Sequence, residues 1–417
     1  MPESFGDCGC RAGAAQDDGD LAMMSGEAAP LRVALVVGLA TGGSARHVAT
    51  LAAGCRAAGL AVTVVAPAPT LALLSADPGI ETFALSIGDR PRPSSDMVTV
   101  ARLRNRLASW HPDVVHAHGV KAGAFAGLAL TGLAVPRRRR PPALAVTAHN
   151  APPVGRRHRL VYGVLERICA RRADLMLCAS ADLAARMRNL GAAEVQQFDV
   201  PAPAASRPSP DEVAKARVDV GAGSRPVVLA VGRLAAQKGF DVLIEAAGRW
   251  RHRDPQPCTV IAGDGPLAEA LRAQAIRSQA DVLLLGQRQD VPALLEIADV
   301  VVVPSRWEAR ALILQEAMRS GKPIVATRVG GTPDLVGGDD QDSASQQDSA
   351  SQQDSAVLIP PDDPAALAVA VTAVLDDPGL AARLRLAART RSATFPTEED
   401  AVKLAMSAYA RLVANRS

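Results

Sequence analysis

The sequence predicts an α/β fold in which two doubly wound parallel sheets lie in separate domains. Apolar runs rich in Val, Ile and Leu alternate with segments of helical periodicity, which is the pattern of βαβ units. The alternation stops once, at the Pro-, Ala- and Ser-rich stretch 201–210, and then restarts. The length of 417 residues also suits two or three domains. Two halves joined by one linker form a cleft, which is a common place for a ligand.

The predicted organisation of the chain has five regions. They are a disordered N-terminal extension (1–29), a first α/β domain (30–200), a linker (201–210), a second α/β domain (211–396) and a C-terminal helix (397–417). Residues 341–356 repeat the hexapeptide QDSASQ and lack apolar side chains larger than Ala, so they predict a solvated insertion in the second domain. Asp340-Gln341-Asp342 is like a D-x-D metal-binding motif, but this low-complexity setting argues against a metal site.

In the first half, each expected strand is an apolar run of the kind that a parallel sheet buries on both faces. The expected strands are Leu31–Val37, Val62–Ala66, Asp113–Val115, Leu144–Thr147 and Leu175–Cys178. The expected helices are one that ends near Ala58, then Met97–Ser109, Lys121–Leu130, Leu160–Arg171 and Ala181–Leu190.

The second half repeats this pattern. The expected strands are Val227–Val231, Thr259–Ala262, Val282–Leu285, Val300–Val303, Ile324–Ala326 and Val357–Ile359. The expected helices are Phe240–Trp250, Pro266–Ile276, one from Ala311 that Gly321 and Pro323 end, two that begin at Ala365 and Leu380, and Glu398–Val413.

Composition excludes several classes of protein. A net charge of +3 and an aromatic content of 3% do not suit a nucleic-acid-binding protein. No run of 18 apolar residues predicts a spanning helix, and the first 30 residues lack the pattern of a secretory signal. The six cysteines are scattered, and Cys8-Gly9-Cys10 lacks a second ligand pair, so we expect no metal there. A reducing, cytoplasmic compartment fits this cysteine usage.

Two glutamates, Glu308 and Glu316, follow the strand Val300–Val303. On one helix they would lie about 12 Å apart, whereas the acid and nucleophile of a retaining glycosidase need about 5–5.5 Å. We therefore place Glu308 in the loop at the carboxyl end of the strand and Glu316 in the next helix. Free N–H groups from about Arg310 to Ile313 would form an anion site there. One carboxylate could hold sugar hydroxyls and the other a ribose, with a diphosphate between them.

The other strand ends of the second half carry cations and glycines. Arg233 and Lys238 follow the strand that ends at Val231, where two fixed cations can neutralise a diphosphate leaving group without proton transfer. Gly263-Asp264-Gly265 follows the next strand and Gly286 the one after it. Glycines at such positions let a nucleotide approach the backbone closely.

In the first half, Gly42-Gly43 follows the first strand without the G-x-G-x-x-G spacing of a dinucleotide site. Its N–H groups could still reach a diphosphate or an acceptor. Arg46 and His47 open the next helix and face either the acceptor or solvent.

Three further histidines end strands of the first half. His149 ends the run VTAH, where it could bind a sugar, orient an acceptor or serve the fold alone. For His116 and His118, which alternate at a strand end, a structural role is favoured.

The order of these motifs resembles the retaining glycosyltransferases of family 4, which carry the signature E-x7-E. The shared order is G-G, T-A-H, G-R-L…K-G, G-D-G-P, E-x7-E and Gly330-Gly331, over roughly residues 30–415 apart from the repeat. The resemblance implies the GT-B fold, in which two Rossmann-like domains face a central cleft and a C-terminal helix crosses back to the first domain. After the first glutamate many family members have Gly, an aromatic residue two positions on, and then Gly or Pro. This chain has Ala309, Arg310 and Ala311 instead, which bears on the donor sugar.

The resemblance also implies roles for three groups of residues. They are catalytic (Arg233, Lys238, Glu308, His149), donor- and nucleotide-binding (Gly42, Gly43, Gly232, Gly263, Asp264, Gly265, Gly286, Ala311, Leu312, Glu316) and acceptor-side (Arg46, His47). No metal and no other cofactor is implied.

The implied reaction is retaining transfer of a hexose-type sugar from a nucleotide-diphosphate sugar to a sugar, lipid or cell-envelope glycan. A nucleotide-sugar epimerase or hydrolase on the same fold, and a non-catalytic sugar-nucleotide-binding protein, stay open as alternatives. Residues 137–172 hold ten arginines against one acid, Glu166. They predict either peripheral contact with the anionic inner face of the membrane or a solvated basic face.

Overall fold

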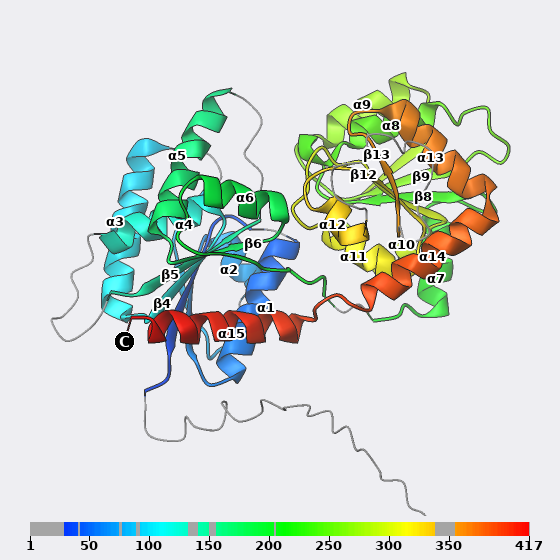
Figure 1. Ribbon diagram of the computed structural model, residues 1–417. Coiled ribbons are helices and arrows are strands. Elements are labelled where there is room, and N and C mark those ends of the chain that lie inside the picture. Colours follow the sequence, from blue (N-terminus) through cyan, green and yellow to red (C-terminus); the bar gives the residue numbers. More distant parts are fainter. Residues whose placement is uncertain are drawn as a thin grey trace, which may run out of the picture.

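The computed structural model describes residues 29–40, 42–74, 77–88, 92–131, 141–149, 156–203, 206–337 and 355–416. Two α/β domains lie side by side, and in each of them helices cover both faces of a parallel sheet (Figure 1). The predicted fold class is therefore confirmed. The N-terminal extension 1–28, the arginine run 137–140 and repeat residues 341–354 lie outside the described residues.

The first sheet has seven parallel strands in the order β3-β2-β1-β4-β5-β6-β7. They are β1 (Arg32–Val37), β2 (Ala61–Ala66), β3 (Glu81–Ala84), β4 (Val114–His118), β5 (Ala143–Ala148), β6 (Leu175–Cys178) and β7 (Val195–Gln197). Its helices are α1 (Gly43–Ala57), α2 (Ala68–Leu74), α3 (Pro93–Trp110), α4 (Val120–Thr131), α5 (Arg156–Arg172) and α6 (Ala181–Asn189). The strand order reverses between β1 and β4, and ligands of open α/β sheets bind at such a switch point.

The second sheet has six parallel strands in the order β10-β9-β8-β11-β12-β13. They are β8 (Val227–Val231), β9 (Cys258–Ala262), β10 (Val282–Gly286), β11 (Val300–Val303), β12 (Ile324–Thr327) and β13 (Val357–Ile359). Its helices are α7 (Pro210–Asp219), the short 3-10 turn η1 (Ala236–Lys238), α8 (Phe240–Gly248), α9 (Ala268–Arg277), α10 (Val291–Ile297), α11 (Leu312–Arg319), α12 (Thr332–Val336), α13 (Pro364–Asp376) and α14 (Pro378–Ser392).

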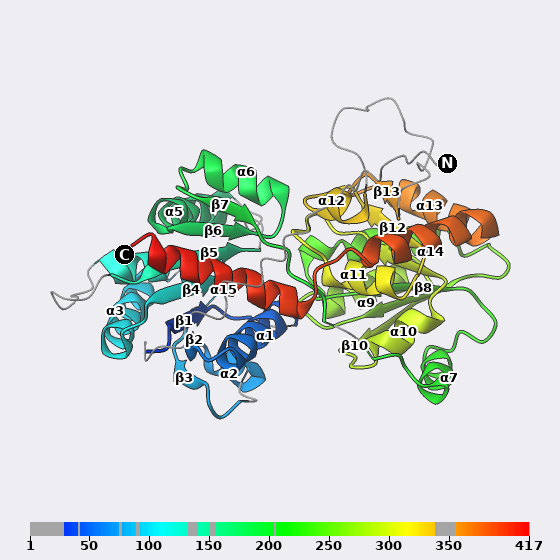
Figure 2. The same cartoon turned by 60° about the horizontal axis from the view of Figure 1, so that its bottom comes forward.

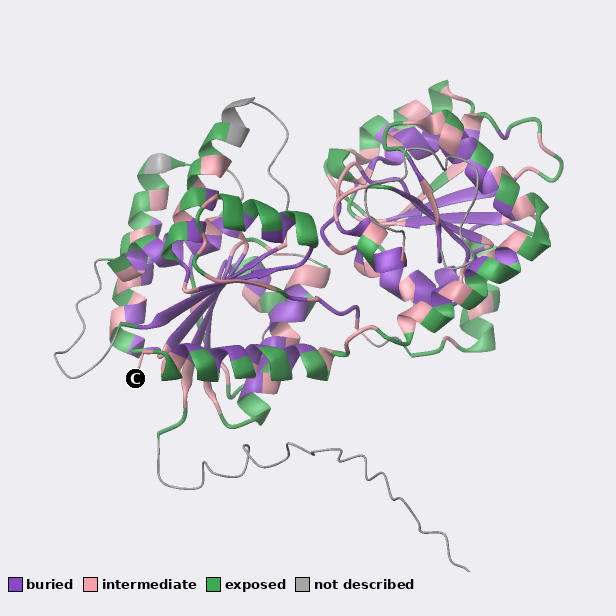
Figure 3. Cartoon of the chain, viewed as in Figure 1, coloured by how far each residue is buried: buried purple, intermediate pink, exposed green. Residues whose placement is uncertain are grey.

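Alternation along the strands explains why both faces of each sheet need helices. In β8, Val227 and Leu229 join one hydrophobic cluster while Val228 and Ala230 join the other. Successive side chains of a strand point to opposite faces, so a strand that is apolar throughout must be covered twice. Figure 3 shows the result, with buried strands inside and exposed residues on the outer faces of the helices.

The C-terminal helix α15 (Glu398–Ala414) begins at a capping box in which Thr397 and Asp400 bond each other's backbone N–H. It packs across α1 of the first domain, as both cartoon views show (Figures 1 and 2). Tyr409 and Leu412 belong to the core of that domain, and a side chain at Gly54 of α1 would collide with Val402. The segment between α14 and α15, where the chain crosses between the domains for the second time, is therefore anchored by the packing of α15 on the first domain.

Several elements differ from the sequence-based expectation. Strand β4 extends to His118, so His116 and His118 lie within the strand. The linker ends one residue early, because Ser209 forms a capping box with Glu212 and Pro210 opens α7. Helices α2, α7 and α12 and strands β3 and β7 were not expected. Elements α12, β3 and β7 have five residues or fewer, which is too short for a periodic pattern. Ser355 and Ala356, the last residues of the predicted insertion, are buried.

Within the described ranges, no single helix has both the length and the apolar composition to cross a membrane, and only the sharply bent pair α13–α14 meets those criteria together.

Candidate functional site

An ion pair at the carboxyl edge of the second sheet is the centre of the candidate site. Lys238 Nζ lies 2.5 Å from Glu308 Oε1, and the Ser305 hydroxyl donates to the same oxygen at 2.6 Å. The Glu308 side chain is 7% exposed and that of Lys238 is 23% exposed. No hydrogen bond to the second oxygen, Oε2, comes from the described residues. A carboxylate with one oxygen occupied and one open can accept a ligand hydroxyl.

The pair is held because two loops lock together, the η1 turn after β8 and the loop after β11. The Arg306 guanidinium donates to Ala236 O at 2.6 Å and its backbone N–H to Gln237 O at 2.7 Å. In return, the Gln237 amide donates to Trp307 O at 2.8 Å. Gly239, with φ near +65°, approaches Pro304 so closely that a Cβ would lie 2.0 Å from its carbonyl oxygen. The K-G pair of the sequence is thus required by packing as well as by charge.

Glycines also bring the neighbouring strand ends together. A Cβ on Gly263 would lie 1.9 Å from Gly232 O, and one on Gly265 would lie 2.6 Å from Leu234 O. Gly263 N donates to Gly286 O at 2.8 Å, which links β9 to β10. Arg233 and Asp264 project from these loops and are exposed. Arg233 has no ion-pair partner among the described residues, so its charge is available to an anion.

Helix α11 carries the second glutamate. Its first residues, Leu312 and Ile313, precede the first helical hydrogen bonds, which Leu314 and Gln315 donate to Ala311 O. The predicted anion site therefore begins one to two residues later than expected, since Arg310 lies outside the helix. Burial raises the pKa of Glu316, while Arg46 of the first domain and Arg319 oppose that rise.

The Gly42-Gly43 turn meets α11 from the first domain. Gly42 has φ near +59° and caps α1, and a Cβ on Gly43 would lie 2.1 Å from Leu312 Cδ1. Glycine is therefore needed here for contact between the domains. The predicted donor-binding residue Leu312 places its side chain against Gly43, which leaves its backbone N–H as the group that a ligand could use.

Four histidines gather at the carboxyl edge of the first sheet. The rings of His116 and His118 lie 4.2 Å apart, and those of His118 and His47 lie 5.8 Å apart. His149 is near enough to affect the pKa values of the other three. Burial lowers the pKa of His47 and of His149 to about 4, so both are neutral at pH 7.

The histidines differ in their hydrogen bonds. His116 Nδ1 lies 2.6 Å from the Tyr409 hydroxyl of α15, and its Nε2 lies 2.7 Å from Thr147 Oγ1. His47 Nε2 and both ring nitrogens of His118 are buried and have no hydrogen-bond partner among the described residues. Unpaired buried polar atoms are costly, which makes this a place for a neutral hydrogen-bonding group.

The structure thus groups the predicted residues in two places. Arg233, Lys238, Glu308 and the glycine turns lie at strand ends of the second sheet, and His47 and His149 lie at the edge of the first. Arg46 is placed near Glu316. Within the described residues, no cluster of three or more His, Cys, Asp or Glu side chains could hold a metal ion.

Sequence reasoning missed several contacts of the loop around Glu308. Trp307 Nε1 donates to Asp182 Oδ2 of α6 at 3.1 Å, and Arg310 Nη1 lies 2.7 Å from Asp199 Oδ1. Gly331 N donates to Glu308 O at 2.9 Å. The one feature of the sequence that could have indicated these contacts is Arg310, which departs from the family pattern after Glu308.

Two family models match the chain. Residues 41–197 match the model described as Glycosyltransferase Family 4. Residues 225–377 match the model described as Glycosyl transferases group 1. The two matches fall on the two domains and include Glu308, Lys238 and His149.

Curated relatives are about a third identical to the chain over the residues that align. Alpha-D-kanosaminyltransferase of Streptomyces kanamyceticus is 32% identical over 175 residues, 41% of this chain and 42% of the relative. Glycogen synthase of Mycobacterium tuberculosis H37Rv is 32% identical over 292 residues, 68% of this chain and 65% of the relative. D-inositol 3-phosphate glycosyltransferase of Salinispora arenicola is 34% identical over 196 residues, 44% of this chain and 41% of the relative. The chain covers less than two thirds of the length of each of these relatives.

Solved structures share the fold at low sequence identity. Anabaena HepE, in complex with UDP and glucose, superposes with a TM-score of 0.73 at 20% identity, covering 91% of this chain and 99% of that one. A glycosyltransferase from Rickettsia africae superposes with a TM-score of 0.72 at 15% identity, covering 93% and 99%. At such identities the similarity establishes the two-domain architecture alone.

Proposed function

Because the chain belongs to the family-4 glycosyltransferases with the GT-B fold, we propose that it transfers a sugar from a nucleotide-diphosphate sugar to a hydroxyl acceptor. We further propose that the sugar is of hexose type and that transfer retains the anomeric configuration. The observation that carries the proposal is the Lys238–Glu308 pair at the carboxyl ends of β8 and β11, with the exposed Arg233 in the same loop as Lys238.

The donor's diphosphate is the group whose charge grows as the sugar departs. Lys238, the exposed Arg233 and the N–H groups of Leu312 and Ile313 supply positive charge without a proton transfer. The open Oε2 of Glu308 accepts from a sugar hydroxyl, and Glu316 accepts from the ribose. No metal takes part in this scheme.

Retention without an enzyme nucleophile requires the acceptor to attack from the face that the leaving group vacates. Glu308 is already committed to Lys238 and Ser305, which makes it a poor nucleophile. A same-face, internal-return displacement follows as the working mechanism. The departing phosphate oxygen then takes the proton of the acceptor hydroxyl.

The acceptor enters from the first domain. His47, His118 and His149 are neutral at pH 7, because burial lowers the pKa of each. Neutral imidazoles both donate and accept hydrogen bonds, so they suit hydroxyl groups better than anions. A sugar, a polyol or the sugar head of a lipid has this chemistry.

The test is a donor screen followed by product analysis. UDP, GDP and ADP, and their glucose and mannose derivatives, would be ranked by thermal shift, with UDP-glucose first because Anabaena HepE was solved with it. Donor consumption would then be followed with methyl glucoside, glycerol and myo-inositol as acceptors, and the product anomer assigned by NMR. Product of the donor's anomeric configuration supports the proposal. Turnover without any acceptor would favour an epimerase or hydrolase, and binding without turnover a non-catalytic sensor.

We also propose that α5 of the first domain rests on an anionic membrane. Leu160, Val164, Arg167 and Arg171 are exposed at the spacing of one helix face. The one acid of this region, Glu166, is fully buried and bound through both oxygens to Arg186 at 2.7 and 2.6 Å. The exposed face therefore combines apolar and basic side chains, as interfacial helices do.

Vesicle co-sedimentation tests this proposal separately from catalysis. We expect binding to anionic vesicles that weakens with salt and falls in Arg167→Ser/Arg171→Ser and in Leu160→Ser/Val164→Ser, since charge and apolar area both contribute. Equal binding to neutral and anionic vesicles would contradict the proposed preference for an anionic surface, and binding to neither would remove the membrane from the scheme.

A further inference from the structure

The loop from Pro304 to Ala311, here called the Glu308 loop, contacts both domains in alternation. Glu308 turns back to Lys238 of its own domain. Its neighbours Trp307 and Ala309 pack instead against the hydrophobic core of the first domain. The residue that carries the proposed sugar-binding carboxylate is therefore clamped between two bodies, and its position depends on how they are oriented.

Arg310 connects this loop to both crossings of the chain between the domains. Its guanidinium pairs with Asp199, which lies on the first crossing between β7 and α7. The same guanidinium lies 5.8 Å from the ring centroid of Phe395, on the second crossing between α14 and α15. The Arg310 side chain is only 10% exposed and Asp199 is 36% exposed.

Helix α11 holds the first crossing as well. The fully buried Gln315 side chain accepts from Ala202 N and donates to Val200 O, each at 3.0 Å. Arg319 donates to Ala202 O at 2.5 Å. Residues 200–202, which the sequence places in or beside a linker, are thus fixed to the helix that carries Glu316. Figure 2 shows both connecting segments running past α11.

We propose that Arg310 is a positioning residue that couples the relative orientation of the two domains to the placement of Glu308. A rotation that displaces Asp199 must either pull Arg310 with it or leave a largely buried guanidinium without its carboxylate, which is costly. Because Arg310 is two residues from Glu308, a rotation that pulls Arg310 along with Asp199 also moves the sugar-binding carboxylate of Glu308. The orientation of the domains is then set by the same contact that places Glu308.

A purely structural ion pair is the competing explanation, and the loop offers a matched control. Arg306 Nε pairs with Asp362 Oδ1 at 2.7 Å, the same separation as in the Arg310–Asp199 pair. The Arg306–Asp362 contact lies entirely within the second domain. Asp199→Asn and Asp362→Asn thus each remove one carboxylate partner of an arginine in the Glu308 loop, and only Asp199→Asn affects a contact between domains. Arg306 keeps its second partner, Asp241, in the control.

The experiment compares Asp199→Asn, Arg310→Ala, Arg310→Lys and Asp362→Asn with the wild type. The radius of gyration with and without UDP would be measured by small-angle scattering, and the UDP affinity by calorimetry. Activity would be measured as the rate at which UDP is released from the donor. In Asp199→Asn and Arg310→Ala, we expect a larger radius of gyration in the presence of UDP and at least a tenfold lower rate. The UDP affinity should change less than threefold, and Arg310→Lys should recover part of the rate.

Three results would overturn the inference. One is scattering and rates in Asp199→Asn and Arg310→Ala that match those of Asp362→Asn. Another is a parallel loss of UDP affinity, which would place Arg310 at the nucleotide itself. The third is additive effects in Asp199→Asn/Arg310→Ala, because members of one pair must be non-additive. The rate measurement rests on the proposed transferase function, whereas the scattering comparison decides the coupling even if no donor is turned over.

Discussion

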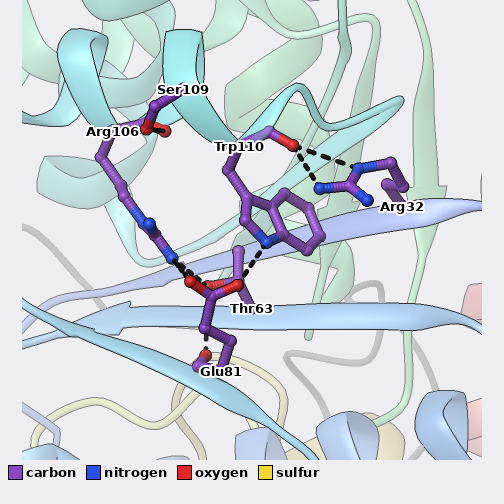
Figure 4. A network of polar contacts seen from close by, with 6 residues as sticks. All are labelled: Arg32, Thr63, Glu81, Arg106, Ser109 and Trp110. Carbon is purple, nitrogen blue, oxygen red and sulfur yellow. Dashed lines mark hydrogen bonds and ion pairs between the residues drawn. The ribbon is translucent and has the colours of Figure 1, made fainter.

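Two polar clusters, one at the amino edge of the first sheet and one at the carboxyl edge of the second, differ in how many of their polar groups are paired. At the amino edge of the first sheet, Glu81 at the start of β3 accepts from Arg106 at 2.5 Å and from Trp110 Nε1 at 2.7 Å (Figure 4). Arg32 at the start of β1 donates to Trp110 O and stacks over its ring at 4.3 Å. At the carboxyl edge of the second sheet, Lys238 and Ser305 share one oxygen of Glu308, and Arg233 has no partner among the described residues.

The difference shows that the first cluster uses its polar groups to stabilise the fold, whereas the second leaves polar groups open to a ligand. Both oxygens of Glu81 are used within the fold, and its partners lower its pKa. Glu308 Oε2 and Arg233 stay available at strand ends, where α/β proteins bind ligands. Substitutions at the two edges should therefore affect different properties.

The largest expected effect is on activity at the carboxyl edge. Arg233→Ala and Lys238→Ala should each lower the rate of transfer at least a hundredfold, because each cation stabilises charge that grows in the transition state. Arg233→Ala should leave the melting temperature unchanged, since Arg233 is exposed. Lys238→Ala should also cost about 1–3 kcal/mol of stability, because Glu308 stays buried without its partner. Near-wild-type turnover in either variant would remove that residue from the leaving-group role.

The next effect concerns pH and the first sheet's histidines. His47, His116 and His149 have pKa values lowered to about 4, 3 and 4, against 6.5 in an unfolded chain. As pH falls below 6.5 the unfolded state binds more protons than the native state, so the stability contributed by these histidines is fully present above 6.5 and is lost down to about pH 3. Each unit of depression corresponds to about 1.4 kcal/mol.

Denaturant unfolding at several pH values between 7 and 4 would measure the slope of unfolding free energy against pH. His47→Phe should make the pH dependence shallower by the contribution of one histidine and leave stability at pH 7 nearly unchanged, because Phe replaces an unpaired buried nitrogen beside Phe198. A slope that is the same in this variant would mean that His47 is protonated readily in the native state.

A smaller effect is expected at the amino edge. Glu81→Gln should lower stability by about 0.5–1 kcal/mol, because the Glu81 side chain is half exposed and its ion pair is screened by solvent. Donor affinity and transfer rate should not change, since the network lies at the edge away from the candidate site. Loss of activity without loss of stability would contradict the division between the two edges.

The smallest effect is expected from the repeat, which belongs to neither cluster. Deletion of Gln341–Gln352 should leave melting temperature and donor affinity within error, because shortening a solvated loop changes its closure cost by about 0.6 kcal/mol per doubling. The flanks are already joined, as Ser355 Oγ donates to Val336 O at 2.7 Å. A clear drop in donor affinity in the deletion variant would indicate that the repeat takes part in binding.

Much of the fold could be predicted from the sequence because its signals are local. Strands β6, β8 and β11 have the residues that the apolar runs indicated, since a strand buried on both faces needs no partner to be recognised. The edge strand β13 also has the predicted residues, because its three residues are all apolar. The exposed edge strand β3 and the three-residue β7 were missed because their stability comes from pairing with a neighbour. The motif order likewise indicated where charged and glycine residues meet the strand ends.

The sequence by itself determined the two parallel sheets, the order of the turns and the chemical types present at them. Only the tertiary structure decided which groups meet: Arg310 with Asp199 across 111 positions, Trp307 with Asp182 across 125, and His116 with Tyr409 across 293. The physical reason is range. Periodicity and propensity act within one helix or strand, whereas ion pairs and buried hydrogen bonds depend on which distant segments the packing of two cores brings within about 3 Å.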